Sequence, residues 1–469
     1  MIPKIIKQGL GIASGSFGQK AFGVINIFLL HSVLGLTSFG LFMLMMSVVN
    51  LVAQMSTFSL PNVIFKAIGK DKQQSARKDL LPNILYTALG TSTLSYVVLL
   101  AVADPLCDLI LNSNQVGNFR TISLLVISTT FINVFRAILV NFDKVRKSIW
   151  PGLAEVMART VGLLSLLLFD TSIEYAVAVY VLSGLAALTI SVLFSYGILK
   201  EAGFRFSIGA IKYTLHLGNA LFISSLGIML VFNVDRLMLG WLSTPDNVGY
   251  YVLASTIANV LLMIHGSFAT LFKPRAATLV EQTEYKTLEI LYFTLGRWSQ
   301  IMNGILFLFM NVFAIYILQV FIDITDADSV QLLILILSIN ALMHISAGPS
   351  SSLLQMAGGY RQEIFNTLMF LIVNILLNIF LIPEIGVSGA AIATVLSGLM
   401  RITFQLVQIK KMVGFFIIRW KGLLLFSMLS SLVVAFQLTG VGLVIQSVIV
   451  VVYSLAIMAF ALRMNLEVK

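Results

Sequence analysis

The chain alternates between long apolar runs and short polar connections. Fourteen apolar runs are long enough to cross a membrane, since a spanning helix needs roughly 17 to 25 apolar residues. The predicted spans are 10–34, 38–60, 80–103, 118–140, 149–169, 174–198, 213–241, 248–272, 289–321, 330–355, 362–382, 386–409, 416–437 and 441–462. This pattern predicts an all-α polytopic membrane protein with about 14 transmembrane helices.

Composition agrees with a lipid-embedded chain. Hydrophobic residues make up 58% of the 469 positions and charged residues only 11%, whereas soluble proteins carry roughly a quarter charged residues. The single cysteine, Cys107, excludes an intrachain disulfide and a cysteine-cluster metal site. The four histidines fall in four different predicted spans without metal-like spacing. The sequence therefore predicts no metal and no cofactor.

The basic residues divide the connections into two sides. Of the 30 Lys and Arg residues, 23 fall in alternate connections, at the adjoining span ends or at the two termini, while the opposite connections are acidic. By the positive-inside rule the basic side is cytoplasmic, so both termini are predicted to lie in the cytoplasm. A DNA-binding surface would need a basic face in water, so the net charge of +10 indicates membrane topology and not a nucleic-acid partner.

Short motifs recur about 210 residues apart, in the same order. FGLF at 39–42 matches VGYY at 248–251, and VLSGL at 181–185 recurs at 395–399. Pro61 and Pro274 are predicted to close spans 2 and 8. Two six-helix lobes follow, related by a parallel repeat around a central cavity, because an even number of spans keeps both copies in one orientation. The predicted divisions are an N-terminal lobe at 1–206, a C-terminal lobe at 207–412, and two extra helices at 413–469.

Ionisable residues inside the predicted spans are the candidate functional residues, because an isolated charge in the bilayer is costly. Away from the span ends, the acids are Glu155 and Asp235, which are candidates for ion coupling. Six basic residues against two acids leave an excess of four positive charges. This excess favours an anionic cargo, and arginine suits phosphate because its planar fork binds two oxygens at once. The basic residues predicted to bind substrate are Lys20, Arg136, Arg159, Arg236, Arg297 and Arg401.

Each charge also has a structural interpretation. Glu155 and Arg159 stand four apart in the favourable order, so they could neutralise each other. Arg136 and Arg297 lie near span ends, where side chains snorkel to headgroups. Asp235 could form a salt bridge between helices instead of coupling an ion.

Depth separates three of the basic residues from the rest. Lys20, Arg159 and Arg401 are predicted near mid-membrane, where snorkelling is difficult. We therefore expect these three to face the central cavity and to form its anion-binding surface.

Three segments resemble a known family: NVDRLMLG at 233–240, NVGYY at 247–251, and GVSGAAIAT at 386–394. The chain is similar to the polysaccharide-export branch of the multidrug/oligosaccharidyl-lipid/polysaccharide (MOP) flippase superfamily, and most like O-antigen (Wzx-type) flippases. The resemblance implies that an undecaprenyl-pyrophosphate-linked oligosaccharide moves from the cytoplasmic to the outer leaflet by alternating access. It also implies a multi-pass, monomeric protein of the bacterial cytoplasmic membrane, working beside other glycan-assembly proteins.

Two other functions in the same superfamily stay open. A lipid II flippase would account for the two extra spans, and a cation-coupled multidrug exporter would favour acids in the N-terminal cavity. An enzyme is not expected, because the longest outer connection, about 104–117, leaves no room for a catalytic domain. The sequence does not distinguish a Na⁺ gradient, a H⁺ gradient or the membrane potential as the driving force.

Overall fold

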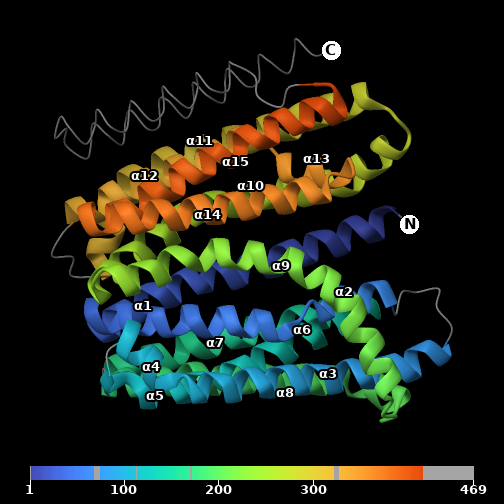
Figure 1. The fold of residues 1–469 in the computed structure, drawn as a ribbon, viewed down its shortest axis with the longest axis horizontal. Helices are drawn as coiled ribbons and strands as arrows, with labels where there is room; N and C mark the ends of the chain where they lie inside the picture. Colours follow the sequence, from blue (N-terminus) through green and yellow to red (C-terminus); the bar gives the residue numbers. More distant parts are fainter. Residues whose placement is uncertain (1, 68–73, 112, 170–171, 322–326, 416–469) are drawn as a thin grey trace. The chain divides into compact units, whose positions relative to one another are not determined.

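The computed structural model describes residues 2–67, 74–111, 113–169, 172–321 and 327–415, and within these ranges the chain forms helices and no strands (Figure 1). The predicted all-α fold is confirmed. The last two predicted spans, at 416–437 and 441–462, lie outside the described residues, so the count of 14 stays a prediction. The α-helices are α1 (Ile2–Thr57), α2 (Leu60–Ala67), α3 (Gln74–Ala101), α4 (Ala103–Leu106), α5 (Val116–Ile122), α6 (Leu125–Asn141), α7 (Val145–Phe169), α8 (Ile173–Ala202), α9 (Ile208–Leu242), α10 (Pro245–Glu281), α11 (Tyr285–Phe321), α12 (Ala327–Ser346), α13 (Ser350–Met356), α14 (Tyr360–Ile385) and α15 (Val387–Val413).

Each of the first twelve predicted spans falls on one helix or on two consecutive helices. α1 contains the first two, and Gly35 separates them with a left-handed backbone (φ 69°, ψ 171°), which glycine adopts without a steric penalty. Eight helical stretches among the described residues are long and apolar enough to cross a membrane. The chain is therefore a multi-pass membrane protein.

One detail of the sequence prediction was wrong. α10 continues through Pro274 to Glu281, so this proline does not end the helix. The structure also shows that the outer connection at 104–117 contains most of α4, a π-helical turn at Cys107–Leu111 and a 3₁₀ turn at Ser113–Gln115. Hydrophobic periodicity does not identify such short helices, since each has too few residues to show a face.

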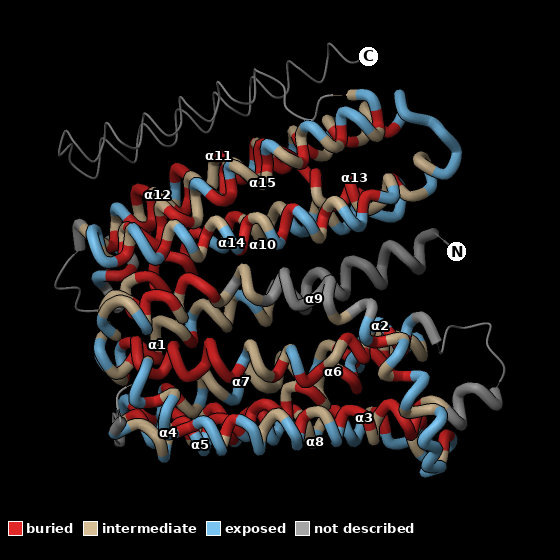
Figure 2. Tube along the Cα trace, viewed as in Figure 1, coloured by how far each residue is buried: buried red, intermediate tan, exposed pale blue. Residues whose placement is uncertain are grey.

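The chain forms two compact units, an N-terminal unit (Met1–Gly249) and a C-terminal unit (Tyr250–Lys469). The N-terminal unit contains α9, which belongs to the second predicted repeat, and the predicted lobes at 1–206 and 207–412 stay a prediction. A core of Leu60, Ile84, Val134, Ile138 and Ile198 joins α2, α3, α6 and α8. Figure 2 shows the buried residues of this unit in red along α6 and α3.

Helix packing inside the two units follows the predicted repeat. In the N-terminal unit α6 packs against α3 and α8, and α7 packs against α8; in the C-terminal unit α12 packs against α11 and α15, and α14 against α15. The repeated VLSGL motif has the same role in both. A Cβ on Gly184 of α8 would meet Ser128 of α6 at 3.2 Å, and one on Gly398 of α15 would meet Asn340 of α12 at 2.6 Å. Small residues here let helices approach closely.

The glycines of the other repeated motif lie against each other. A Cβ on Gly40 would stand 1.9 Å from the Pro245 carbonyl oxygen and 3.3 Å from the Gly249 backbone nitrogen. A Cβ on Gly249 would in turn meet the Leu36 side chain at 2.8 Å. The equivalent glycines of the two motifs, Gly40 of α1 and Gly249 near the start of α10, therefore pack closely within the N-terminal unit.

Candidate functional site

One buried ion pair lies within α7 of the N-terminal unit. Arg159 Nη2 donates to Glu155 Oε1 one helical turn earlier, and the two side chains are 17% and 19% exposed. Arg159 also reaches α8, where its Nε donates to Ser183 Oγ at 3.0 Å. Its guanidinium carbon lies 4.4 Å from the centre of the Tyr180 ring, which is within the range of a cation–π contact. The predicted helical pair is thus formed, with two further partners on the next helix.

Polar contacts join α1 to α7 beside this pair. Gln19 Nε2 donates to the Ile149 carbonyl at 2.9 Å, and Asn26 Nδ2 donates to the Val156 carbonyl at 2.9 Å. Lys20, the next residue after Gln19, is exposed. Among the described residues Lys20 has no hydrogen-bond or ion-pair partner, so no described carboxylate neutralises its charge.

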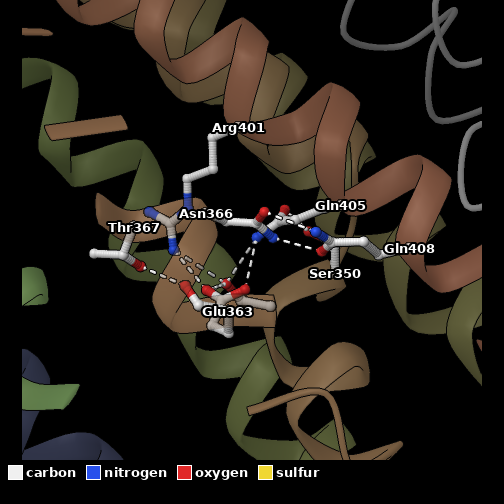
Figure 3. Close-up of polar contacts among 8 residues, drawn as sticks. Ser350, Glu363, Asn366, Thr367, Arg401, Gln405 and Gln408 are labelled. Carbon is white, nitrogen blue, oxygen red and sulfur yellow. Dashed lines mark hydrogen bonds and ion pairs between the residues drawn. The ribbon is translucent and has the colours of Figure 1, made fainter. Parts of the chain in front are cut away.

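A second, larger polar network lies in the C-terminal unit, around the carboxylate of Glu363 at the start of α14 (Figure 3). Arg401 Nη2 of α15 donates to Glu363 Oε1 at 2.7 Å, and Ser351 Oγ of α13 donates to the same oxygen at 2.5 Å. Gln405 Nε2, one turn after Arg401, donates to Glu363 Oε2 at 3.1 Å. Three donors from two helices therefore hold one buried carboxylate, and charge-assisted bonds of this kind are the strong ones.

Around this carboxylate the network continues through amides. Ser350 Oγ donates to Gln405 Oε1 at 2.8 Å. Asn366 and Gln408 exchange two bonds, of 2.7 Å and 3.0 Å, between α14 and α15. Arg401 Nε, by contrast, is buried without a partner within the part of the chain that the structure describes.

The break between α12 and α13 presents the two serines to this network. α12 ends at Ser346, Gly348 has φ 61°, and α13 begins at Ser350. Pro349 has no backbone N–H to continue the helix, and the Tyr292 hydroxyl donates to the Ala347 carbonyl that the break leaves free. Broken helices inside membranes are tolerated where other groups satisfy the backbone.

Arg136 is in a different setting, on the exposed face of α6 beside the end of α1. It lines a pocket of about 300 Å³ together with Gln54, Thr57 and Asn133. Among the described residues, Arg136, Gln54 and Asn133 make no hydrogen bond or ion pair with the protein. Polar residues of α1 and α6, which lie far apart in the sequence, are therefore brought together around one cavity.

The remaining predicted residues lie elsewhere. Arg236 and Asp235 are on α9, and Asp235 is only 6% exposed; Arg297 is half-buried on α11. All three have interaction partners. The structure does not gather the six predicted basic residues into one cluster within either unit, and their role in substrate binding stays a prediction. No group of three metal-ligating side chains occurs among the described residues.

Glu363 is the functional candidate that the sequence analysis missed. It stands at the second position of the predicted span 362–382, beside the polar connection, and the sequence analysis does not include it among the intramembrane acids. Its partner Arg401 is 38 residues away, a spacing that no helical or strand periodicity brings together. With Glu363 included, the basic excess among the candidate charges of the predicted spans is three instead of four.

Comparison with known structures identifies the class of the fold. The lipid II flippase MurJ in an inward closed conformation matches with a TM-score of 0.74 and 13% identity, over 97% of this chain and 99% of that one. An inward-facing multidrug resistance MATE transporter of the MOP superfamily matches with a TM-score of 0.64 and 15% identity, over 88% and 96%. A MOP superfamily transporter from Pyrococcus furiosus matches with a TM-score of 0.59 and 15% identity, over 91% and 96%. The protein therefore has the fold of MOP-superfamily transporters.

Sequence comparison then places it in a family. A family model described as "Polysaccharide biosynthesis protein" matches residues 5–277, more than half of the 469 residues. The chain belongs to this polysaccharide biosynthesis family. A search of curated protein sequences finds no match.

Proposed function

We propose that the protein is a flippase that moves an undecaprenyl-pyrophosphate-linked oligosaccharide, an O-antigen or related surface-glycan unit, from the cytoplasmic to the outer leaflet. The observation that carries this proposal is the joint membership of the chain in a polysaccharide biosynthesis family and in a transporter fold. A polysaccharide pathway built on a lipid carrier has one step that such a fold suits, the transfer of the carrier-linked glycan across the bilayer. Fold alone does not determine function, so the proposal that the cargo is a glycan rests on the family match.

The charges of the described residues support an anionic cargo. Lys20 and Arg136 are basic groups with no described carboxylate beside them, whereas Arg159 and Arg401 each hold one. Lys20, Arg159 and Arg401 are still proposed to face the path of the pyrophosphate, with Arg236 and Arg297 as further basic residues along it. Of the central three, Lys20 is free to bind directly, while the two arginines would have to exchange a carboxylate oxygen for a phosphate oxygen.

The driving force is proposed to be an ion gradient or the membrane potential. Asp235 and Glu155 are the acids that the sequence assigns to ion coupling, and Asp235 is the more deeply buried of the two. Glu155 is committed to Arg159 in this structure. Asp235 is therefore the stronger candidate of the two.

Reconstitution into liposomes tests this function. The probe is a fluorescent undecaprenyl-pyrophosphate-linked oligosaccharide. An impermeant quencher is added outside the liposomes, and the readout is the fluorescence that is lost as probe moves from the inner to the outer leaflet. We expect flipping well above that of protein-free liposomes. Parallel liposomes carry fluorescent lipid II or a cationic dye. Transport of lipid II alone would replace the cargo with that of a lipid II flippase, and transport of the dye alone would make the protein a multidrug exporter.

A further inference from the structure

The pocket around Arg136 combines groups that recognise sugars with a group that recognises phosphate. Gln54 from α1 and Asn133 from α6 are primary amides, each with two donors and an acceptor. Thr57 donates to the Ala53 carbonyl at 2.8 Å, which leaves its oxygen free to accept. Such mixed donors and acceptors match the hydroxyls of a sugar, while the fork of Arg136 matches phosphate oxygens.

These polar groups make no described contact that stabilises the fold. Among the described residues Gln54, Asn133 and Arg136 have no protein partner, although they lie on predicted membrane spans. Polar side chains inside membrane proteins normally pair with one another or line a water-filled path. Residues that only stabilised the contact of α1 with α6 would be bonded across it, as Ser56 and Thr130 are. The free amides therefore point to a ligand.

The walls of the pocket have a suitable size and character. Its volume is about 300 Å³, at the lower end of the roughly 300–1,000 Å³ that small-molecule sites occupy. Pro61 and the exposed ring of Phe65 supply apolar wall, which packs against the C–H face of a pyranose. None of the described residues that line the pocket is acidic, so this part of its wall does not repel a phosphate.

The pocket lies at the end of the helices where the proposed cargo would enter. α1 ends at Thr57 and α6 at Asn141, and both lead into the basic connections that the positive-inside rule assigns to the cytoplasm. The second repeat lacks the amide on its matching helix, because the residue 209 positions after Gln54 is Met263. The pocket is thus a feature of one repeat and not of the shared fold.

We propose that this pocket binds the phosphate-proximal sugar of the lipid-linked glycan, with Gln54 and Asn133 on its hydroxyls and Arg136 on the phosphate attached to it. The proposal rests on the proposed flippase function and adds to it a site that selects cargo by its first sugar. An anionic phospholipid headgroup offers the same phosphate chemistry to Arg136. It would gain less from the two amides, and the test below separates these two sources.

Binding to the purified protein in lipid nanodiscs tests the site. The probes are undecaprenyl pyrophosphate bearing one N-acetylhexosamine, bare undecaprenyl pyrophosphate and phosphatidylglycerol. Gln54→Met and Asn133→Leu should each weaken binding of the sugar-bearing probe by about tenfold, the range of one or two neutral hydrogen bonds, and leave the bare probe unchanged. Arg136→Gln should weaken both pyrophosphate probes, by about ten- to a hundredfold, because it removes charge-assisted bonds.

Matched controls are Asn50→Ala, one turn before Gln54 on α1, and Arg146→Gln, an exposed arginine on α7 outside the pocket. Both should bind all probes like the wild type. Unchanged binding of the sugar-bearing probe by all three pocket variants would overturn the site. So would a loss of phosphatidylglycerol binding in Arg136→Gln with no effect of the amide variants, which would identify a phospholipid site.

The flipping assay separates this proposal from the proposed function. A wild-type protein that binds the probes in the expected pattern but flips no lipid-linked glycan would keep the site and overturn the flippase. A protein that flips the glycan at the same rate in all three pocket variants would keep the flippase and overturn the site.

Discussion

The two units neutralise the charge of a buried arginine in different ways. In the N-terminal unit, Arg159 and Glu155 share one helix and one turn, and the neighbouring helix adds a hydroxyl and an aromatic ring. In the C-terminal unit, Arg401 and Glu363 come from different helices, and a third helix adds a serine. The first pair stabilises α7 and its contact with α8. The second joins α13, α14 and α15 through a single carboxylate.

This difference predicts how each pair tolerates damage. When a pair within one helix is broken, the helix itself stays folded. After loss of Glu155, Arg159 would retain its contacts with Ser183 and Tyr180. A pair between helices holds the packing itself, and the loss of Glu363 would leave the arginine and two further donors without their acceptor. Removing one partner of a buried ion pair is more damaging than removing both, because the remaining charge is uncompensated.

The largest expected effect is therefore that of Glu363→Ala. We expect it to lower the free energy of unfolding by about 3–5 kcal/mol, against about 1–3 kcal/mol for Glu155→Ala, whose arginine keeps other partners. Thermal unfolding of the purified proteins in detergent measures both. The double variant Glu363→Gln with Arg401→Gln should recover most of the loss. Equal destabilisation by Glu363→Ala and Glu155→Ala would show that the two pairs do not differ.

The next comparison sets Lys20 of the N-terminal unit, which has no partner among the described residues, against the paired Arg401 of the C-terminal unit. Lys20→Ala should slow flipping about ten- to a hundredfold, as expected for loss of a hydrogen-bonded charge, without lowering stability. Lys20→Arg should retain substantial flipping because an ammonium acts as a point charge. Arg401→Lys should lose more, since a bidentate fork is not replaced by an ammonium.

Measurement of unfolding beside flipping separates the two roles of Arg401. If the Glu363→Gln, Arg401→Gln double variant is stable and flips like the wild type, Arg401 serves packing and not transport. If Lys20→Ala flips normally, Lys20 is not part of the anion path.

How far the sequence predicted this structure depends on the distance between partners. The spans and the Glu155–Arg159 pair follow from local spacing, because apolar runs and one-turn neighbours are visible in the sequence. The repeat predicted the matching glycines, which do pack in equivalent places. Glu363 with Arg401, and Gln54 with Asn133, could not be predicted, because only the packing of separate helices brings them together.

Equivalent glycines give a third comparison. Gly40→Ala would place a Cβ 1.9 Å from the Pro245 carbonyl oxygen, whereas Gly249→Ala would meet the end of the Leu36 side chain at 2.8 Å. Backbone cannot move aside as a side chain can, so we expect Gly40→Ala to destabilise by about 1–3 kcal/mol and Gly249→Ala by less. Gly90→Ala on α3 is the matched control, since nothing lies within 4 Å of its Cβ. A neutral Gly40→Ala would refute the close packing of these glycines.

The smallest expected effect is a difference in cysteine labelling, which tests the predicted topology. Cys107 is fully buried, and burial together with the nearby carboxylates of Asp104 and Asp108 raises the pKa of its thiol to about 11. Since the thiolate is the reactive form, the wild-type protein should label slowly with an impermeant maleimide at neutral pH and faster as the pH rises towards that pKa. This leaves a low background for new cysteines.

In intact cells Asn114→Cys, exposed in the predicted outer connection, should label at once. Lys411→Cys, exposed at the end of α15, should label only after permeabilisation, because the positive-inside rule places it in the cytoplasm. Labelling of Lys411→Cys in intact cells would reverse the orientation, and the pocket around Arg136 would then open to the outer leaflet instead of the side where the cargo is made.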